Sequence, residues 1–388
     1  MSQFLHLFSP IRIGNMEVPN RIVHVPTDIS SSNADGSVSE HDLYHHGEIA
    51  KGGAGLIIVG ATTPDAKTGR PTVTCLVADS DNFIPGLARL AESMHRYGAK
   101  CAVQLMHPGR QCAIPRYNTL SANDRVLKLP WSAGHEIVYE NAEEKGKAVR
   151  AATTEEILEL IELFSEAAWR VKQAGFDAVE VHAAHDSLLA QFMSPLTNQR
   201  EDGWGGPVEN RCRLHREVGK AVRDRVGREF PLLLKFGFED GIKDGLDRED
   251  GLEAAALLAK DYDVLEVSQG LQGGPMAETV FRAIPKDGMG LFRDISHALK
   301  ERTSVPVLLT GGIRDLEKAE QLIANKDADL IGMCRPFIRQ PALVRRWLQG
   351  DTKRATCTSC NGCVAAIGKG QPLACQLDLG GLTIDPKR

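Results

Sequence analysis

The chain has 388 residues, of which 42% are hydrophobic and 25% are charged, and it carries a net charge of -5 and a pI of about 6.2. This is the composition of an ordinary soluble protein that can bury one large core. It contains no basic blocks interleaved with aromatic residues, which argues against binding to nucleic acid. The first ten residues are too few and too polar for a signal peptide, and no apolar run reaches membrane-spanning length. We therefore expect a cytoplasmic protein with no membrane partner.

Eight short apolar segments recur along the chain, and segments with helical periodicity separate most of them. The predicted strands are residues 21–26, 55–60, 100–105, 178–181, 232–236, 264–268, 305–310 and 329–334. The predicted helices are one that ends near residue 51, then 87–97, 153–175, 188–193, 212–225, 248–260, 291–302 and 316–325. Thr153 and Glu156 have the spacing of a capping box. The long polar connection 106–151 is typical of a functional loop or a lid.

This alternation predicts a closed (β/α)8 barrel of the TIM type, a fold that takes roughly 250 residues or more. A doubly wound open sheet is the alternative. That fold usually carries a Gly-x-Gly-x-x-Gly turn after an early strand, and this chain has none there. We therefore expect residues 1–350 to form one barrel and residues 351–388 to form a cysteine-rich extension.

Nine cysteines divide into two groups. Five are scattered over the predicted barrel, which suits free thiols in a reducing cytoplasm better than a disulfide framework. The other four, Cys357, Cys360, Cys363 and Cys375, lie close together in the extension. Their spacing indicates a tetrathiolate site, and from spacing alone it fits either structural zinc or an iron–sulfur cluster.

His182 and His185 follow the fourth predicted strand, and a long polar, glycine-rich segment comes next. Either histidine could be a hydrogen-bonded packing residue. Active sites in this fold, however, lie at the carboxyl ends of the strands, so two imidazoles three residues apart at that position are candidates for chemistry.

The loops after strands seven and eight form a candidate phosphate site. Strand seven ends in Gly311-Gly312, a helix begins near Asp315, and strand eight ends in Cys334-Arg335. In barrels these loops bind phosphate through backbone N–H groups and a helix dipole, and Arg335 could add a charge-assisted pair. The alternative is that the glycines serve only tight turns.

The segment from Phe176 to Arg213 resembles the old yellow enzyme superfamily of NADH:flavin oxidoreductases, in particular the branch of 2,4-dienoyl-CoA reductase and trimethylamine dehydrogenase. The family pattern runs His-x-x-(His/Asn)-Gly-Tyr-Leu, then Phe-Leu-Ser-Pro, Asn-x-Arg-x-Asp-x-Tyr-Gly-Gly and Glu-Asn-Arg. The chain departs from it at Asp186-Ser187, where the family has Gly-Tyr. The resemblance extends over roughly residues 5–375, and it includes the Gly-Gly-Ile-Arg and Gly-Met-Cys-Arg-Pro-Phe-Ile stretches.

The resemblance implies FMN at the barrel mouth. Its phosphate would be bound by Gly311, Gly312, Cys334 and Arg335, and its ring would be lined by Pro26, Thr27, Asp28, Ala61, Gln104 and Lys235. Gln104 would hydrogen-bond the pyrimidine edge, and Lys235 would place a cation beside N1 and O2. Asp28 would lie near N5 and O4, where relatives have Thr or Cys. If ionised and facing the ring, it would disfavour the anionic reduced flavin; otherwise it is protonated or turned away.

The same resemblance implies that His182 and His185 hydrogen-bond a substrate carbonyl oxygen and stabilise an enolate-like transition state. Ser187 occupies the place of the family's tyrosine proton donor and is a poor acid. Asp186 could donate only with a raised pKa, and water, Tyr44 or Tyr117 could act instead. The catalytic candidates are His182, His185, Asp186 and Ser187.

The implied function is FMN-dependent hydride transfer, most simply the NAD(P)H-driven reduction of an α,β-unsaturated carbonyl or enoyl-CoA compound. Two alternatives are an N-methyl amine dehydrogenase that passes electrons to a cluster and a non-catalytic electron-transfer subunit. The resemblance favours a [4Fe–4S] cluster over zinc. Relatives of that branch continue into a nucleotide-binding domain, so an external electron carrier or partner flavoprotein would take its place. We also expect a homo-oligomer.

Overall fold

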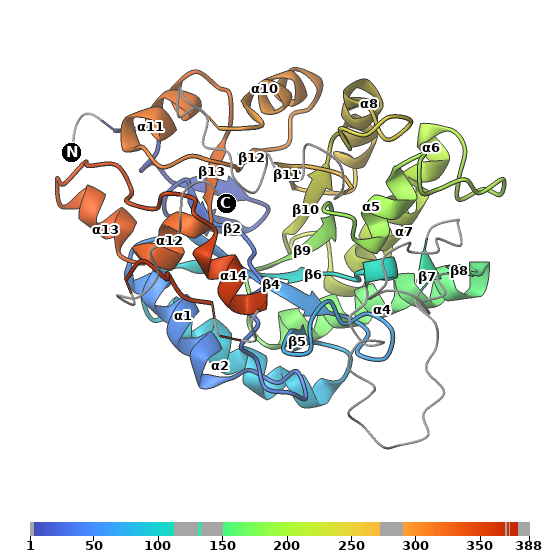
Figure 1. Ribbon diagram of the computed structural model, residues 1–388, viewed down its shortest axis with the longest axis horizontal. Helices are drawn as coiled ribbons and strands as arrows, with labels where there is room; N and C mark the ends of the chain where they lie inside the picture. The colour runs from blue at the N-terminus through green and yellow to red at the C-terminus, as the bar shows by residue number, and fades with distance from the viewer. Residues whose placement is uncertain are drawn as a thin grey trace.

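A closed barrel of eight parallel strands forms the centre of the computed structural model, which describes residues 4–111, 131–132, 150–271, 290–368, 371 and 373–378 (Figure 1). The strands are β3 (Ile22–His24), β4 (Leu56–Thr63), β6 (Lys100–Leu105), β9 (Ala178–Ala183), β10 (Leu232–Gly237), β11 (Val264–Ser268), β12 (Val307–Leu309) and β13 (Leu330–Met333). Pairing of β3 with both β13 and β4 closes the ring. The predicted TIM-type barrel and its eight strands are confirmed. A short strand, β5 (Leu76–Val77), extends the sheet beside β4.

Helices surround the strands, as Figure 1 shows. They are α1 (Glu40–Lys51), α2 (Ile84–His95), α4 (Thr154–Gln173), α7 (Arg213–Val226), α8 (Arg248–Leu258), α10 (Arg293–Arg302), α11 (Leu316–Ala324) and α13 (Leu343–Leu348). The predicted capping box is present: Thr153 Oγ1 accepts from the Glu156 amide, and Glu156 accepts from the Thr153 amide. The other described helical segments are η1 (Asp81–Phe83), η2 (Gly109–Gln111), α5 (Leu188–Met193), α6 (Val208–Arg211), α12 (Arg335–Arg339) and α14 (Gly362–Gly368).

A small hairpin, β1 (Ile11–Ile13) and β2 (Met16–Val18), plugs the amino-terminal end of the barrel. Its turn uses Gly14 at φ +56°, a conformation that glycine adopts without steric cost. Its apolar side chains join the inward-facing side chains of the strands in one buried cluster. The sequence did not predict this hairpin. A second short pair, β7 (Trp131–Ser132) and β8 (Arg150–Ala151), flanks the undescribed part of the long connection.

Three aspartates, Asp177, Asp263 and Asp329, form what we call the rim aspartates, each one residue before a strand. Each accepts a hydrogen bond at 2.8–2.9 Å from a backbone N–H on the neighbouring strand, at Cys101, Leu232 and Val307 respectively. Each also pairs with a cation, namely Lys100, Arg223 and Lys300. This repeated contact ties adjacent strands together. It also accounts for the close grouping of His95, Cys101 and Asp177, whose polar atoms lie within 4.8 Å of one another, without a metal.

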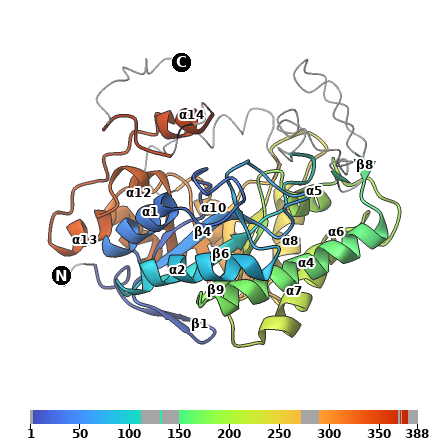
Figure 2. The ribbon, with the colours of Figure 1, turned by 90° about the horizontal axis from the view of Figure 1, so that it is seen from below.

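The extension packs on the barrel at the end opposite the hairpin; Figure 2 shows α14 at the top of the molecule and β1 at the bottom. The Ala355 amide donates to the Arg314 carbonyl oxygen at 2.9 Å, and both Ala355 and Leu373 are buried. The division at residue 350 stays a prediction. Among the described helices, none combines the length and the apolar character that a bilayer crossing requires.

Candidate active site at the carboxyl end of the barrel

Inward-facing polar side chains gather at the carboxyl ends of β6, β9 and β10. Gln104, His182 and Lys235 come from these strands, and each is 4% exposed. Lys235 lies directly opposite His182 in the strand register. Because carboxyl ends of parallel strands meet at one mouth, the structure brings together the two predicted flavin ligands and the first predicted substrate ligand.

The two histidines lie side by side, with ring centroids 5.2 Å apart. His185 Nε2 is 2.6 Å from Ser268 Oγ, and His182 Nδ1 has no partner among the described residues. Burial, with a smaller contribution from the Lys235 charge, lowers the pKa of His185 to about 3; burial and then His185 and Lys235 hold the pKa of His182 well below its usual range. Both imidazoles are therefore neutral near pH 7, and each can donate one N–H to a carbonyl oxygen.

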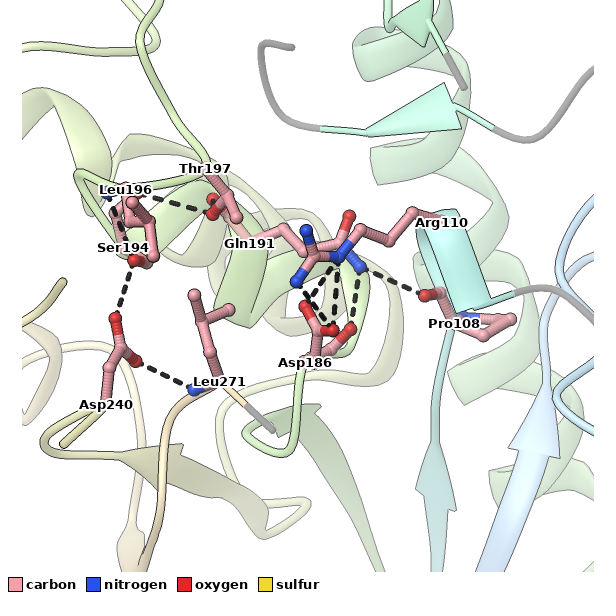
Figure 3. A network of polar contacts seen from close by, with 9 residues as sticks. All are labelled: Pro108, Arg110, Asp186, Gln191, Ser194, Leu196, Thr197, Asp240 and Leu271. Atoms are coloured by element: carbon pink, nitrogen blue, oxygen red, sulfur yellow. Dashed lines mark hydrogen bonds and ion pairs between the residues drawn. The ribbon is translucent and has the colours of Figure 1, made fainter. Parts of the chain in front are cut away.

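Asp186 and Ser187 do not point into this site as proton donors. Asp186 is 3% exposed and accepts three hydrogen bonds from the Arg110 guanidinium at 2.8–3.1 Å, as Figure 3 shows. A carboxylate held this way has no proton to give. Ser187 Oγ donates to the His182 carbonyl oxygen at 3.1 Å. The geometry thus assigns both residues to positioning, and Arg110 is a partner that the sequence did not reveal.

Backbone geometry explains the departure from Gly-Tyr at this point. His185 and Asp186 have φ of +55° and +60°, the left-handed region that glycine adopts most easily and Asp tolerates. Gln191 steadies the turn, because its Nε2 donates to the carbonyl oxygens of Asp186 and Pro108 (Figure 3). The bidentate Arg110 pair offsets the cost of placing Asp where glycine fits.

The two tyrosines considered as substitute donors give no candidate inside the described site. Tyr44 lies on α1, is 68% exposed and lines the groove between α1 and α2 on the outside of the barrel. That expectation was wrong, because the residue faces solvent rather than the barrel mouth. Tyr117 lies outside the described residues.

The predicted ring-binding residues follow β3 and β4. Pro26, Thr27 and Asp28 are half-buried, Ala61 is 6% exposed, and Asp28 forms a parallel bridge with Gly60, so the two segments run side by side. The Asp28 carboxylate accepts from the Ser30 amide at 2.8 Å and from Thr72 Oγ1 at 2.9 Å. Burial raises the pKa of Asp28 and these hydrogen bonds oppose that shift. Of the alternatives left open, the side chain turned toward its own loop fits best.

The glycine loop after β12 has the geometry of a phosphate cradle. Gly311 and Gly312 have φ of +98° and +86°. Helix α11, however, does not offer its amides: Asp315 Oδ1 already accepts from the Glu317 and Lys318 amides. This part of the expectation was wrong, since the helix caps itself. The short helix α12 has no side-chain cap at Cys334.

Two arginines donate hydrogen bonds to the cysteine loop, and one of them also contacts the glycine loop. Arg314, 2% exposed, donates to the Gly312 carbonyl oxygen at 3.2 Å and to Ser359 Oγ. Arg335 Nη1 donates to Asn361 Oδ1 at 2.7 Å. Arg335 therefore lies between the predicted phosphate loop and the extension rather than serving the loop alone. Arg314 was missed, although it completes the Gly-Gly-Ile-Arg stretch.

The four cysteines of the extension line one pocket together with Arg335 and Arg339. Within the described part of the chain, no three of their sulfur atoms lie within 4.8 Å of one another. Four thiols that line one pocket are a donor set that suits either structural zinc or an iron–sulfur cluster.

A buried network lies directly below the predicted flavin ligands, and sequence reasoning missed it. Gln104 Nε2 donates to Glu180 Oε1 at 2.7 Å, and Lys235 Nζ donates to Glu266 Oε1 at 2.5 Å. Both glutamates, which we call the carboxyl pair, are fully buried. The sequence did contain a signal for this network: β9 and β11 are mostly apolar, yet each has one glutamate at an inward-facing position.

The rest of the glycine-rich segment serves the fold. Asn198 Nδ2 donates to the carbonyl oxygens of Phe192 and Trp204, and Arg211 donates to those of Met193 and Gly206. Ser194 Oγ donates to Asp240, which also accepts from the Leu271 amide (Figure 3). These hydrogen bonds tie the segment that follows the histidines to itself and to Asp240.

Comparison with known proteins gives consistent results. The sequence profile of the NADH:flavin oxidoreductase / NADH oxidase family matches residues 6–353. An NADH oxidase of Thermoanaerobacter brockii is 34% identical over 94% of this chain and 54% of its own length, and a cinnamate reductase of Clostridium sporogenes is 31% identical over 97% and 58%. A 2-naphthoyl-CoA reductase complex superposes with a TM-score of 0.86 at 28% identity, over 95% of this chain and 56% of that one. The chain thus spans little more than half the length of these relatives.

Proposed function

We propose, from the premise that this chain belongs to the NADH:flavin oxidoreductase / NADH oxidase family, that it is an FMN-dependent reductase of α,β-unsaturated acyl compounds. The observation that carries the proposal is the pair of neutral, adjacent imidazoles of His182 and His185, which lie at the same barrel mouth as Gln104 and Lys235. A flavin oxidoreductase needs such donors where negative charge develops on the substrate.

The residues present fit FMN. The backbone of Gly311 and Gly312 and the first turn of α12 would hold the phosphate, with Arg335 close by. A Cβ at Gly60 would come within 2.6 Å of Pro26 and 3.2 Å of Gln104 Oε1, so only glycine lets the predicted ring-binding residues Pro26 and Gln104 lie this close to β4. Gln104 and Lys235 would meet its pyrimidine edge. The chemistry that FMN supplies when bound is hydride transfer.

His182 and His185 would donate hydrogen bonds to the carbonyl oxygen of the substrate and withdraw electron density from its conjugated double bond. Preorganised donors of this kind contribute roughly 10²–10³-fold each in other enzymes. The names of two relatives, cinnamate reductase and 2-naphthoyl-CoA reductase, share an unsaturated carbon framework next to a carboxyl or thioester carbonyl. They support that substrate class here. With Asp186 and Ser187 engaged elsewhere, water would supply the one proton that the substrate takes up in addition to the hydride.

The test is anaerobic absorption spectroscopy of the purified protein. We expect a flavin band that NADH or NADPH bleaches and that cinnamate or a 2-enoyl-CoA restores. The His182→Ala variant should keep the flavin and its reduction but lose most of the substrate-driven reoxidation. A colourless protein that takes up no FMN would remove the proposal.

One observation favours a second candidate, an N-methyl amine dehydrogenase. Both residues at the family's Gly-Tyr position are held in other contacts, Asp186 by Arg110 and Ser187 by the His182 carbonyl. Removing a hydride from an amine requires no proton donor at that place. Anaerobic flavin bleaching by dimethylglycine, with none by NAD(P)H, would favour this candidate over the reductase.

The cysteine pocket supports a [4Fe–4S] cluster that passes electrons between FMN and an external carrier or partner flavoprotein. Four thiol donors that line one pocket support a metal site, and the resemblance to the dienoyl-CoA reductase branch favours the cluster over zinc. Metal analysis of anaerobically purified protein should give about four irons per chain. One zinc and no iron would contradict the cluster and leave the flavin proposal standing.

A further inference from the structure

The carboxyl pair is the feature of the site that the proposed function leaves unexplained. Glu180 lies opposite Gln104 in the strand register, and Glu266 lies opposite Lys235. Each glutamate has one oxygen hydrogen-bonded to that neighbour: Oε1 of Glu180 accepts from Gln104, and Oε1 of Glu266 accepts from Lys235. Thus the two side chains predicted to contact the flavin pyrimidine edge each donate a hydrogen bond to a buried carboxyl group.

The second oxygens of the pair find no hydrogen-bond donor among the described residues: Oε2 of Glu180 and Oε2 of Glu266 are both buried. The two carboxyl groups lie within hydrogen-bonding reach of each other, so each can be the other's partner once a proton lies between them. Two ionised carboxylates with unsatisfied oxygens in an apolar barrel would be strongly destabilising. One proton between them removes a charge and gives both oxygens a partner. Because Gln104 and Lys235 donate to the Oε1 atoms, that proton belongs at the Oε2 atoms.

The electrostatics of the site agree with this placement. Burial, and after it the charge of Glu266, raises the pKa of Glu180 well above its usual range, and Lys235 only partly offsets the shift. Other titratable groups near the pair are His182 and His185, which are neutral and add no charge. One lysine therefore faces two carboxyl groups, and charge balance calls for a single negative charge.

We propose that Glu180 and Glu266 share one proton and, with Gln104 and Lys235, form a closed network that sets the charge beneath the flavin. In this network the Lys235 cation is compensated by one carboxylate, so the pyrimidine edge meets a neutral assembly. When the shared proton leaves at alkaline pH, the network becomes anionic and disfavours every anionic form of the flavin. This inference rests on the proposed function for its role, while the shared proton itself needs no flavin.

The first experiment detects the proton directly. Infrared spectra of the purified holoprotein should contain a protonated-carboxyl band that shifts in D₂O and is lost in both Glu180→Gln and Glu266→Gln. A proton shared by the two glutamates predicts that the band disappears in both variants. A band unchanged in either variant would overturn the proposal. Since FMN is not needed for this signal, a failure of flavin binding would not disguise the outcome.

The second experiment measures the effect on the flavin. Sulfite forms an anionic adduct at N5, so its dissociation constant, read from bleaching of the flavin band, reports the local charge. The ratio of wild-type to Glu266→Gln dissociation constants should be near one at low pH and rise at least tenfold at alkaline pH, because only the wild type loses a proton there. The same tenfold change corresponds to about 30 mV in a two-electron potential.

Comparing variants at the same pH cancels the ionisation of sulfite itself. Glu180→Gln should behave like Glu266→Gln, and Glu266→Asp should restore the pH dependence of the wild type. A ratio that stays constant from acid to alkaline pH would contradict the proposal even if the protein binds FMN. A protein without FMN would instead contradict the proposed function, and the infrared result would still decide the shared proton.

Discussion

At the amino-terminal rim of the barrel, each rim aspartate accepts a backbone hydrogen bond and pairs with a cation. Inside the barrel, toward the carboxyl ends of the strands, the carboxyl pair and His182 have polar atoms without a partner among the described residues. Both regions belong to the same barrel strands: the first lies at their amino-terminal ends and the second lies nearer their carboxyl ends. Buried polar groups are nearly always satisfied where they serve stability alone. The contrast therefore separates polar residues that hold the barrel from those whose open positions we assign to a shared proton, in the carboxyl pair, or to a ligand, in His182.

The largest effect on stability should come from breaking the Arg110–Asp186 pair. This pair lies near the candidate site, as the carboxyl pair does, but its charges are paired, as those of the rim aspartates are. Arg110→Ala leaves a carboxylate that is 4% exposed without its guanidinium, and removal of one partner of such a pair costs about 3–5 kcal/mol. We expect that loss in the free energy of unfolding measured with urea. The double variant Arg110→Ala/Asp186→Gly is the matched control: it removes the carboxylate together with the guanidinium, places glycine at φ +60° and should recover most of the stability. No recovery would show that Arg110 acts through other contacts.

The histidine pair should show the reverse pattern, a large effect on activity with little on stability. His182→Ala or His185→Ala removes one donor to the substrate oxygen, which lowers kcat by about 10²–10³-fold in comparable sites. Melting temperature and flavin content should stay near those of the wild type. Steady-state kinetics with an unsaturated acyl substrate checks the first expectation. A loss of turnover accompanied by a large loss of thermal stability would show that these histidines, like the rim aspartates, mainly stabilise the fold.

A rim aspartate should give a pure stability effect. Asp329→Ala leaves the Val307 amide without its acceptor and Lys300 without its partner. The expected loss is about 2 kcal/mol of unfolding free energy, since a buried donor is left unsatisfied while the partly exposed ion pair adds little. Asp329→Asn, which keeps an acceptor oxygen, should lose clearly less. A change in the flavin spectrum of either variant would mean that the two ends are not independent.

The smallest effect concerns pH and the histidines packed between β3 and α1. Burial lowers the pKa of His24 to about 3 and also lowers that of His46. The unfolded chain therefore binds more protons below about pH 6.5, and stability falls as pH drops through that value, by about 1.4 kcal/mol per pH unit and histidine. His24→Leu should make the slope of unfolding free energy against pH shallower by one proton. An unchanged slope would show that His24 is protonated in the folded protein.

The sequence predicted the barrel because its signals are local. Eight apolar runs and the Thr153 capping box each reside in a few consecutive residues. The hairpin β1–β2 escaped notice because strands of three residues have too little periodicity to be recognised. The self-capping of α11 by Asp315 escaped for a different reason: the same residue type marks a helix start whether or not an anion binds there.

For the site, the sequence predicted which residues lie at the carboxyl ends of the strands, because the barrel fold fixes those positions. His182, Gln104 and Lys235 meet because barrel geometry requires it. The partners that decide their charge could not be predicted, since Arg110 reaches Asp186 and Lys235 reaches Glu266 across long sequence separations. Which carboxylate pairs with which cation is a property of packing, and only the fold supplies it.

A crystal structure of the protein with FMN tests the central claim most directly. We expect the phosphate against the Gly311-Gly312 backbone, the pyrimidine edge against Gln104 and Lys235, and one face of the ring toward His182 and His185. FMN bound away from these residues, or a barrel mouth that stays free of FMN at saturating concentration, would contradict the account.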